Sequence, residues 1–509
     1  MIRYSSARSR RYRDRAAPGP RVRRRNGEAE MARTRWSRLV VAVAAAVLTV
    51  SALSACSQAN STQRDVENPW QITGATTSTG PSGPREGVPD TDRQAENGDG
   101  GEMDRLALNA VADIEEFWTE NYPATFPGEF RPVSELISWD ATAPERDSVE
   151  FCTVGTHELV NAAYCGTDET IGWDRGVLLP ELVEQFGDMA VVMVLAHEYG
   201  HALQIPAGIA TEDSPGLVTE QQADCLAGVF LRHVAEGDSR HFTLNTTEGL
   251  NGVLGATVAV RDRDPDDPDN VHGSAFERVT AVQMGYTNGA EACAQIDEQE
   301  IEERRSGLPV TFEEPGEEYL QLEVTEDSLA DMAAALAYIL PVTGSPEYDY
   351  DGVPARCSDT TPTAPVAYCP VTDVIGTDVE ALAERAGETG GEDEPLSAIV
   401  AGDYNAFVVF VSRYTLAYQN DKQLSLVGAE TAGLRTACLS GVVTTALSRE
   451  NSNPRLSAGD LDEAVSGLLA DGMAAGDVNG DVVPEGYLRL DAFRLGVLEG
   501  ESACLAEYE

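Results

Sequence analysis

The chain has 509 residues, a formal net charge of −49 and a hydrophobic fraction of 42%. This length suits two or three domains with hydrophobic cores, and the apolar fraction excludes a chain that is disordered throughout. The strong negative charge argues against nucleic acid as a partner, because binding to phosphates requires clusters of Lys and Arg.

The N-terminal region has the pattern of a bacterial export signal. Residues 1–55 contain 13 Arg and three acidic residues, which leaves 23 basic and 82 acidic residues, a net charge of −59, for the rest. Three Arg follow Met31, and an uncharged, mainly apolar run at 39–53 then leads into Ser54-Ala55-Cys56. This order resembles a lipoprotein signal, which implies a signal region at 1–56, with Met31 as a candidate true start and Cys56 as the lipidated first residue of the mature protein. An uncleaved anchor is the alternative, and both place the rest of the chain outside the cytoplasm.

Beyond the signal, the chain changes from polar to helical. Residues 57–102 are rich in small and polar side chains and predict a flexible linker, because they bury too little apolar surface to offset the entropy of ordering. Short strands are expected near 168–172 and 373–377, and helical periodicity dominates elsewhere, so the predicted fold class is α+β and predominantly helical. The expected helices are 105–121, 180–204, 218–236, 274–289, 324–339, 398–419, 429–448, 459–475 and 487–500.

The eight Cys that follow Cys56 occur in two sets of four with nearly the same spacing. The sets are offset by 205, 204, 213 and 211 residues, and identical residues flank them in the same order, such as Tyr164-Cys165 and Tyr368-Cys369. We interpret the chain as two diverged copies of one domain, 103–300 and 315–509. An even number of Cys in an exported chain suggests disulfides. The most economical pairing is Cys152–Cys165, Cys225–Cys293, Cys357–Cys369 and Cys438–Cys504.

The first copy contains a motif that suits a divalent metal ion. An apolar stretch without Pro runs from Met189 into His197-Glu198-Tyr199-Gly200-His201. Residues four apart share one face of a helix, so the two His side chains can bind one ion, and Glu198 beside them can hold a water molecule. The alternative is a buried helix with two hydrogen-bonded histidines.

A second helical segment offers a carboxylate ligand. Glu220 and Asp224 are four residues apart within the expected helix 218–236. Catalytic zinc binds three protein ligands and keeps one position open, so Glu220 would be the third ligand after the two histidines. Asp224, one turn later, would accept a hydrogen bond from a ligand His and fix its tautomer. Two solvated acids on a helix surface are the alternative.

The second copy has lost these residues. The repeats place Ser412, Arg413, Leu416, Gly433 and Ala437 opposite His197, Glu198, His201, Glu220 and Asp224. The Cys and packing residues persist while all five polar positions change. The five are therefore not needed for the scaffold, and we expect the second copy to be free of metal.

Four segments of the first copy resemble the neutral zinc metallopeptidase family of bacteria, a gluzincin-like group. They are the Cys152…Tyr164-Cys165 region, HEYGHALQ at 197–204, EQQADCLAGVF at 220–230 and HGSAFERVTAVQMGYTNGAEAC at 272–293. The resemblance covers about 150–295. It implies a zincin-like metallopeptidase domain at 103–300 that hydrolyses peptide bonds, and it identifies no substrate.

The predicted reaction is hydrolysis by a water molecule that Zn²⁺ activates. The ion would acidify the water and polarise the scissile carbonyl, and Glu198 would take the water's proton. His272 is the candidate hydrogen-bond donor to the oxyanion, ahead of Tyr199, although a His before Gly can also simply cap the next helix.

The sequence thus predicts a zinc metallopeptidase at the bacterial cell surface, anchored to the membrane through Cys56 and acting on a peptide or protein. The competing hypothesis is a non-catalytic surface lipoprotein, with a structural or vestigial metal site, that binds a partner. Glu198 distinguishes the two, because a structural zinc site has no use for a carboxylate beside its ligands. The sequence predicts no oligomeric state.

Overall fold

The computed structural model describes residues 72, 74–262, 271–305, 308, 321–354, 356–387, 396–449, 452–457 and 459–509. Residues 69–509 belong to one compact unit. The predicted signal region at 1–56, with Met31 and Cys56, lies outside the described residues. Within the described part, no helix combines the length and the apolar character that crossing a membrane requires.

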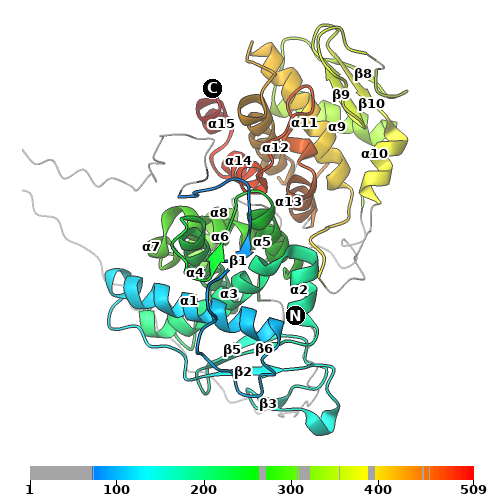
Figure 1. Ribbon diagram of the computed structural model, residues 1–509. Coiled ribbons are helices and arrows are strands. Elements are labelled where there is room, and N and C mark those ends of the chain that lie inside the picture. The colour runs from blue at the N-terminus through cyan, green and yellow to red at the C-terminus, as the bar shows by residue number, and fades with distance from the viewer. Residues whose placement is uncertain are drawn as a thin grey trace, which may run out of the picture. The chain divides into compact units, whose positions relative to one another are not determined.

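The first half combines a three-stranded sheet with a set of helices. Strand β2 (Glu135–Trp139) runs parallel to β6 (Thr170–Asp174), and β5 (Ala162–Cys165) pairs antiparallel with β6. The order β2-β6-β5 leaves β5 at the edge of the sheet. The helices, blue to green in Figure 1, are α1 (Glu102–Thr125), α2 (Leu178–Phe186), α3 (Asp188–Ala207), α4 (Gly216–Ala235), α5 (Glu248–Ala259), α6 (Ala275–Asn288), α7 (Ala290–Cys293) and α8 (Glu298–Arg305).

The second half repeats this arrangement. Strand β8 (Glu347–Asp349) is parallel to β10 (Val374–Thr377), β9 (Val366–Cys369) is antiparallel to it, and the order is β8-β10-β9. The helices are α9 (Glu326–Ile339), α10 (Val379–Ala386), α11 (Tyr404–Asp421), α12 (Leu434–Leu447), α13 (Asp460–Ala470), α14 (Gly486–Glu499) and α15 (Glu501–Glu507). The matching order and strand pairing support the interpretation of two related copies.

Glycines let the same pair of helices pack closely in each half. An added Cβ at Gly228 of α4 would lie 2.1 Å from a carbonyl oxygen of α6, and one at Gly441 of α12 would lie 2.2 Å from a carbonyl oxygen of α14. In the opposite direction, Cβ atoms added at Gly285 and Gly496 would lie 1.7 and 1.8 Å from carbonyl oxygens of α4 and α12. Only glycine fits at these four positions, so both halves preserve one helix–helix contact.

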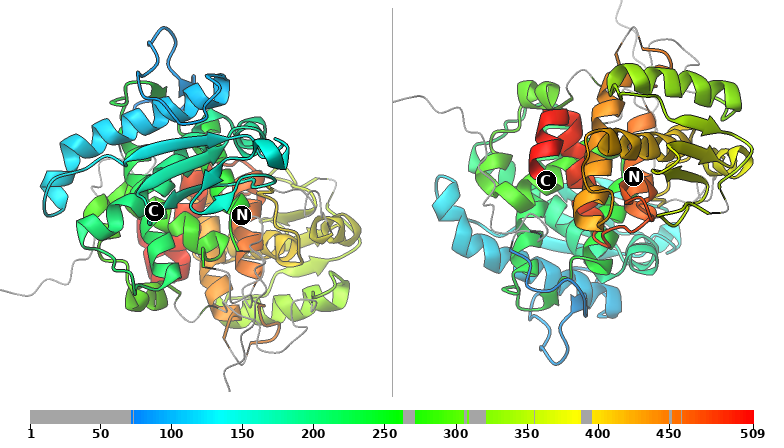
Figure 2. Two further views of the ribbon diagram at one scale, coloured as in Figure 1. Left: turned by 90° about the horizontal axis from the view of Figure 1, so that it is seen from below. Right: turned by 90° about the horizontal axis from the view of Figure 1, so that it is seen from above.

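The two halves also contact each other and share a hydrophobic core. Helices α5 and α6 lie against α13 and α14, and the orange to red helices are beside the green ones in both views of Figure 2. The side chain of Gln283 in α6 donates to the backbone carbonyl of Tyr487 in α14 (3.1 Å). Buried apolar residues of both halves form one continuous cluster.

The predicted disulfides and the predominance of helix are confirmed. Four Cys pairs have Cα atoms 5.4 to 5.6 Å apart, namely Cys152–Cys165, Cys225–Cys293, Cys357–Cys369 and Cys438–Cys504. The fold is a mixed α+β fold that is mostly helical, as expected. Every expected helix overlaps an observed one, but the expected helix 180–204 is two helices, separated at Gly187 with φ +83°.

Some elements have no clear sequence signal. Helix α5 is rich in Gly and is buried along most of its length, so it lacks the alternation of apolar and polar residues that marks a helix. Strands β2, β5, β8 and β9 were not among the expected elements. All four are short; β2, β5 and β9 are also mostly buried rather than alternating, and β8 has only three residues.

Residues 74–101 differ from the flexible linker expected at 57–102. Strand β1 (Gly83–Pro84) pairs with β7 (Phe242–Thr243), and Arg85 donates from Nε to the backbone carbonyls of Ser239 (3.1 Å) and Phe242 (2.7 Å). Hydrogen bonds rather than apolar burial fix this segment, which is why its polar composition suggested a linker.

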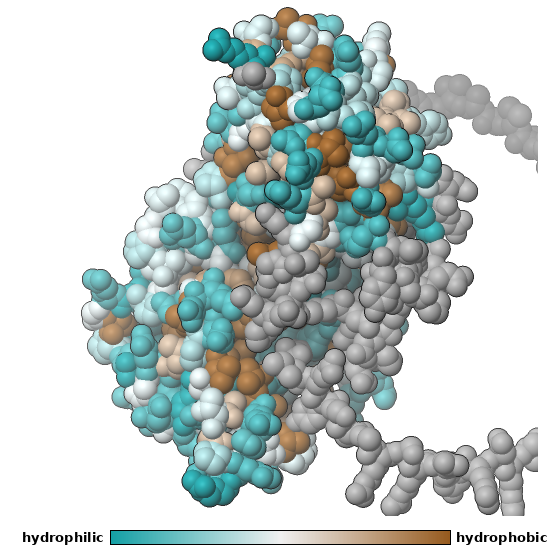
Figure 3. Space-filling view, turned by 90° about the vertical axis from the view of Figure 1, so that its right-hand side faces the viewer, coloured by the Kyte–Doolittle hydropathy of each residue, from teal (hydrophilic) through white to brown (hydrophobic). Residues whose placement is uncertain are grey.

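The face shown in Figure 3 is mainly hydrophilic where its residues are coloured. On the face shown in Figure 3, hydrophobic side chains form small patches between hydrophilic ones. Single exposed apolar residues of this kind are normal on protein surfaces. In the described part, the large exposed ones are Ile205, Leu322, Tyr338, Val371, Ile399 and Val427.

Candidate metal centre

Helices α3 and α4 bring the three candidate ligands together. Helix α3 is buried along most of its length and carries His197 and His201 one turn apart, so both imidazoles face the same side. Between them, Gly200 lets α4 approach, because an added Cβ would lie 2.8 Å from the Cα of Ala223. This close packing places Glu220, near the start of α4, beside the two histidines.

The ligand atoms lie at distances that suit one ion. Nε2 of His197 is 3.2 Å from Nε2 of His201 and 3.2 Å from Oε2 of Glu220, and Nε2 of His201 is 3.6 Å from Oε1 of Glu220. Ligands in a tetrahedral zinc site would be about 3.3 Å from each other. Oε2 of Glu220 is buried and receives no well-directed hydrogen bond from the described residues. The three residues therefore form a buried group that could hold a metal ion.

A buried carboxylate orients the first histidine. Nδ1–H of His197 donates to Oδ1 of Asp224 (2.7 Å), so Nε2 is the ring nitrogen that faces the other two ligands. Arg278 of α6 holds both oxygens of Asp224 with hydrogen bonds of 2.8 Å. The structure thus places Asp224 where the spacing predicts it. In the sequence, Arg278 has a counterpart in Arg489 of the second copy, 211 residues later, but that identity does not assign it this role.

The charges of the group favour a cation. Burial alone would lower the pKa of His197, but the carboxylates of Asp224 and Glu220 raise it to about 10. Burial would raise the pKa of Glu220, but the close imidazoles of His197 and His201 hold it well below its usual range. The two carboxylates thus create a negative field at the imidazoles, and the same field attracts a metal ion.

Gln204 orients the second histidine. Nδ1–H of His201 donates to Oε1 of Gln204 (3.2 Å). The amide of Gln204 in turn donates to the backbone carbonyl of Thr219 and to Oε1 of Gln222, both in α4. In the sequence, Gln204 ends the HEYGHALQ segment and has a counterpart in Gln419 of the second copy, but neither fact assigns it a role. Its position three residues after His201, about one helical turn, is the signal that could have assigned this role.

Glu198 lies beside the ligands and faces the edge strand. Its Oε2 accepts a hydrogen bond from the backbone N–H of Tyr164 in β5 (2.9 Å). The residue is 5% exposed, and burial raises the pKa of its carboxyl against the opposing effect of the two histidines. A carboxylate whose pKa is raised is a better proton acceptor near neutral pH.

His272 reaches the same site from the loop before α6. Its Nδ1–H donates to Oδ1 of Asp262 (2.8 Å), and its Nε2 lies 3.7 Å from Oε2 of Glu220. The cap of α6 is Ser274, whose side chain accepts from the N–H of Glu277, so His272 is not needed for capping. Asp262 is thus the hydrogen-bond partner of His272, and residues 263–270, which follow it, lie outside the described part.

Tyr199 does not point to the metal group. Its hydroxyl donates to Oε1 of Glu115 in α1 (3.1 Å) and accepts from the backbone N–H of Val133 (3.1 Å). The side chain therefore connects α3 to α1 and to the segment before β2. Of the two candidates for an oxyanion donor, only His272 lies at the site.

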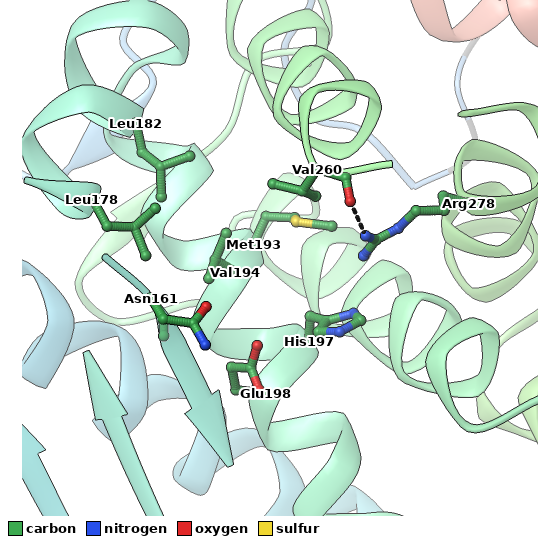
Figure 4. Close-up of a pocket in the computed structure, with 10 residues that line it drawn as sticks. Asn161, Leu178, Leu182, Met193, Val194, His197, Glu198, Val260 and Arg278 are labelled. Atoms are coloured by element: carbon green, nitrogen blue, oxygen red, sulfur yellow. Dashed lines mark hydrogen bonds between the residues drawn. The ribbon is translucent and has the colours of Figure 1, made fainter. Parts of the chain in front are cut away.

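A cleft opens beside Glu198 (Figure 4). It has a volume of about 450 Å³, including the open space at its mouth. His197 and Glu198 lie on one side of it with Asn161 close by, and the aliphatic side chains of α2, α3 and Val260 form the remaining wall. The lining residues are Asn161, Ala162, Leu178, Leu182, Met193, Val194, His197, Glu198, Val260 and Arg278.

The second half has different residues at the positions equivalent to the metal group and Glu198. Gly433 replaces Glu220, and an added Cβ there would lie 2.6 Å from the carbonyl oxygen of Ala475, so the chain itself fills the space. Arg413 replaces Glu198. It is buried, burial lowers its pKa to about 10, and in the described part its Nη1 has no hydrogen-bond partner. A cation therefore stands where the first half has an acid.

The second half has its own acidic group, which no sequence pattern indicates. Asp403, Asp460 and Glu463 are buried, and their ligand atoms lie within 4.8 Å of one another, close enough to hold a metal ion. Burial raises the pKa of Asp403 to about 6 and, together with the charge of Asp403, that of Asp460 to about 7. The expectation that this copy is free of metal thus stays a prediction.

Comparisons with known proteins give relatives without a described function. The chain is 30% identical over 187 residues to uncharacterized proteins of Mycobacterium bovis (strain ATCC BAA-935 / AF2122/97) and of two Mycobacterium tuberculosis strains, CDC 1551 / Oshkosh and ATCC 25618 / H37Rv. The alignment covers 32% of this chain and 61% of each relative, so the chain spans less than two thirds of their length. No family model matches the chain, and no solved structure matches it.

Proposed function

We propose that the protein is a zinc-dependent metallopeptidase of the gluzincin-like group that its motifs resemble, exported and anchored to the cell surface through Cys56. The main support is the convergence of His197, His201 and Glu220 on one point, with the buried carboxylate of Glu198 beside them and a cleft in front. The four disulfides fit export, because such bonds persist in oxidising compartments.

The residues fit a zinc ion. Two imidazole nitrogens and one carboxylate form the usual ligand set of a catalytic zinc site, and their spacing matches a tetrahedral ion. In the described part, Oε2 of Glu220 receives no well-directed hydrogen bond. Zinc held there would supply a Lewis acid for the scissile carbonyl and would acidify a water molecule in the cleft. Carboxylate and imidazole ligands favour zinc over softer metals, and metal analysis identifies the ion.

Glu198 and His272 would perform the proton and charge steps. Glu198 would accept the proton of the attacking water and deliver it to the leaving nitrogen, and the hydrogen bond from Tyr164 N–H holds it in place. His272, kept in one orientation by Asp262, would donate a hydrogen bond to the oxyanion of the tetrahedral intermediate. Asp224 and Gln204 keep the ligand imidazoles oriented during turnover.

The substrate would bind along the edge strand. Strand β5 pairs with β6 on one side only. Its other side, where the N–H of Tyr164 bonds to Glu198, would pair with a peptide in extended conformation through its remaining backbone groups. The aliphatic wall of the cleft then receives an apolar side chain of the substrate, which predicts cleavage next to residues such as Leu or Phe.

The test uses the purified ectodomain and a library of peptides with central Leu or Phe. We expect one zinc ion at the site and measurable cleavage in the wild type. Glu198→Gln should retain the zinc and lose activity by at least about 10³-fold, because it removes the general base and not a ligand. Wild-type protein that holds zinc but cleaves none of the peptides would refute the peptidase proposal in favour of a surface binding protein.

A further inference from the structure

The interface between the two halves contains a pair of equivalent contacts. Asp462 in α13 of the second half accepts hydrogen bonds from the backbone N–H groups of Ala275 (2.9 Å) and Phe276 (3.1 Å), at the start of α6 in the first half. Asn251 in α5 of the first half accepts from the N–H of Gly486 (2.7 Å), at the start of α14 in the second. Asp462 is 211 positions after Asn251, the offset that also separates Cys504 from Cys293.

Each half thus caps a helix of the other half, as in a symmetric dimer. The first N–H groups of a helix have no partner within the helix and need acceptors from outside. In α6, Ser274 and Glu277 form a capping box. The N–H groups of the first two helical residues take no part in the box, and both donate to the carboxylate of Asp462. The negative charge also suits the positive end of the helix dipole. Asp462 therefore fixes the first turn of α6.

This turn directly follows His272. Asp262 on the other side accepts hydrogen bonds from the backbone N–H of His272 (2.7 Å) and Gly273 (2.8 Å). Arg261, the neighbour of Asp262, has its Nε 3.9 Å from Oδ2 of Asp462. The carboxylate of Asp462 thus contacts the chain both before and after the segment that carries the imidazole.

We propose that Asp462, supplied by the copy without the zinc motif, is a positioning residue for the site of the first copy. Asp462 fixes the start of α6 and pairs with the guanidinium of Arg261. In this way it holds Nε2 of His272 at 3.7 Å from Oε2 of Glu220. The inference rests on the proposed peptidase function for its catalytic consequence, but its structural part does not. It gives the second half a role in the activity of the first.

Asn251 is the matched control for this proposal. It occupies the equivalent position and contributes to the same interface, through hydrogen bonds with Gly486 and with the carbonyl of Pro484 (3.0 Å). The helix that it caps, α14, lies in the copy without the zinc motif, whereas α6 directly follows the candidate site residue His272. If the interface mattered only for stability, removing either side chain would have the same consequence.

The experiment compares Asp462→Asn, Asp462→Ala and Asn251→Ala in the full ectodomain by zinc content, hydrogen exchange and peptide cleavage. For both Asp462 variants we expect zinc content like that of the wild type, faster exchange of the amides of 271–278, and a kcat lower by about 10- to 100-fold with KM changed less than threefold, since an oxyanion donor contributes about 10²–10³ in kcat. Asn251→Ala should leave the zinc content, kcat and KM like those of the wild type, and should not change the exchange of the amides of 271–278. Asp462→Asn keeps the shape of the side chain and guards against simple unfolding.

A double-mutant cycle separates positioning from general damage. In a His272→Ala background, Asp462→Asn should lower kcat by less than about twofold, because its effect passes through a residue that is already absent. An undiminished effect in that background would overturn the proposal. If the wild type cleaves no peptide, the peptidase function fails, and hydrogen exchange alone decides the inference: exchange at 271–278 that is equal in Asp462→Asn and wild type would refute it.

Discussion

The first and second halves share a framework, but only the first has the His and carboxylate group that suits zinc. In both, a sheet of the same strand order adjoins helices that pack through glycines, and a disulfide joins the last residue of the edge strand to a cysteine before that strand. In the second half, however, Gly433 is at the position equivalent to Glu220, and the carbonyl of Ala475 occupies the space that a side chain there would need. The comparison teaches that glycines and cysteines carry the fold, whereas the five polar residues of the site are additional to it.

One buried carboxylate in each half shows an opposite shift of its pKa. Asp224 is fully buried, but Arg278 and His197 outweigh the effect of burial and lower its pKa. Asp460 is also buried, and with the nearby charge of Asp403 its pKa rises to about 7. The surroundings of Asp224 therefore stabilise its charged form, while the surroundings of Asp460 disfavour the charged form. Mutations in both halves can test these two contrasts.

The largest effect is expected where the framework is shared. Gly228→Ala and Gly441→Ala should each lower the free energy of unfolding by at least about 3 kcal/mol, because the new methyl group would lie 2.1 or 2.2 Å from a backbone oxygen and the helices must separate. Urea denaturation measures the loss. Only Gly228→Ala should also weaken zinc binding, since α4 carries Glu220. A mild effect at one position alone would break the correspondence between the halves.

The sequence indicates the residues that repeat at short range and not those that distant segments bring together. His197 and His201 follow from a spacing of four, and the Cys pairs follow from two similar sets of intervals. The contact of Asp224 with Arg278 joins α4 to α6, and no periodicity reports it. The same holds for the acidic group of the second half, whose members lie on α13 and at the start of α11. Only the packing of helices places them within reach.

A second test concerns the acidic group, and its sign follows from the raised pKa. Between about pH 4 and pH 7, the folded state binds more protons at Asp460 than the unfolded state does, so the free energy of unfolding falls as pH rises through this window. Asp460→Asn should therefore stabilise the protein at pH 8 by about 2–4 kcal/mol and have little effect near pH 4. The hydrogen bonds from Ser457 can be kept, because its hydroxyl can also accept from the new amide.

Thermal unfolding in EDTA at the two pH values measures this difference without a bound cation. Asp331→Asn, at an exposed position of α9, is the control and should change the stability by less than about 0.5 kcal/mol at either pH. A variant at Asp460 that is less stable than the wild type at pH 8 would show that the charged carboxylate is favourable there. The contrast with Asp224 would then be lost.

The smallest effect, and the sharpest comparison, involves the two equivalent glutamines. Gln204 orients His201, whereas Gln419 bonds to Thr436 and Arg435 within the second half. Gln204→Ala should weaken zinc binding by about tenfold, or about 1.4 kcal/mol, as is usual for residues that orient a ligand. Gln419→Ala should leave the zinc affinity unchanged. It should lower the free energy of unfolding by about 1–2 kcal/mol, because buried hydrogen bonds are lost. Competition with a chromophoric chelator measures the affinity, and equal zinc affinities in the two variants would remove Gln204 from the support of the metal centre.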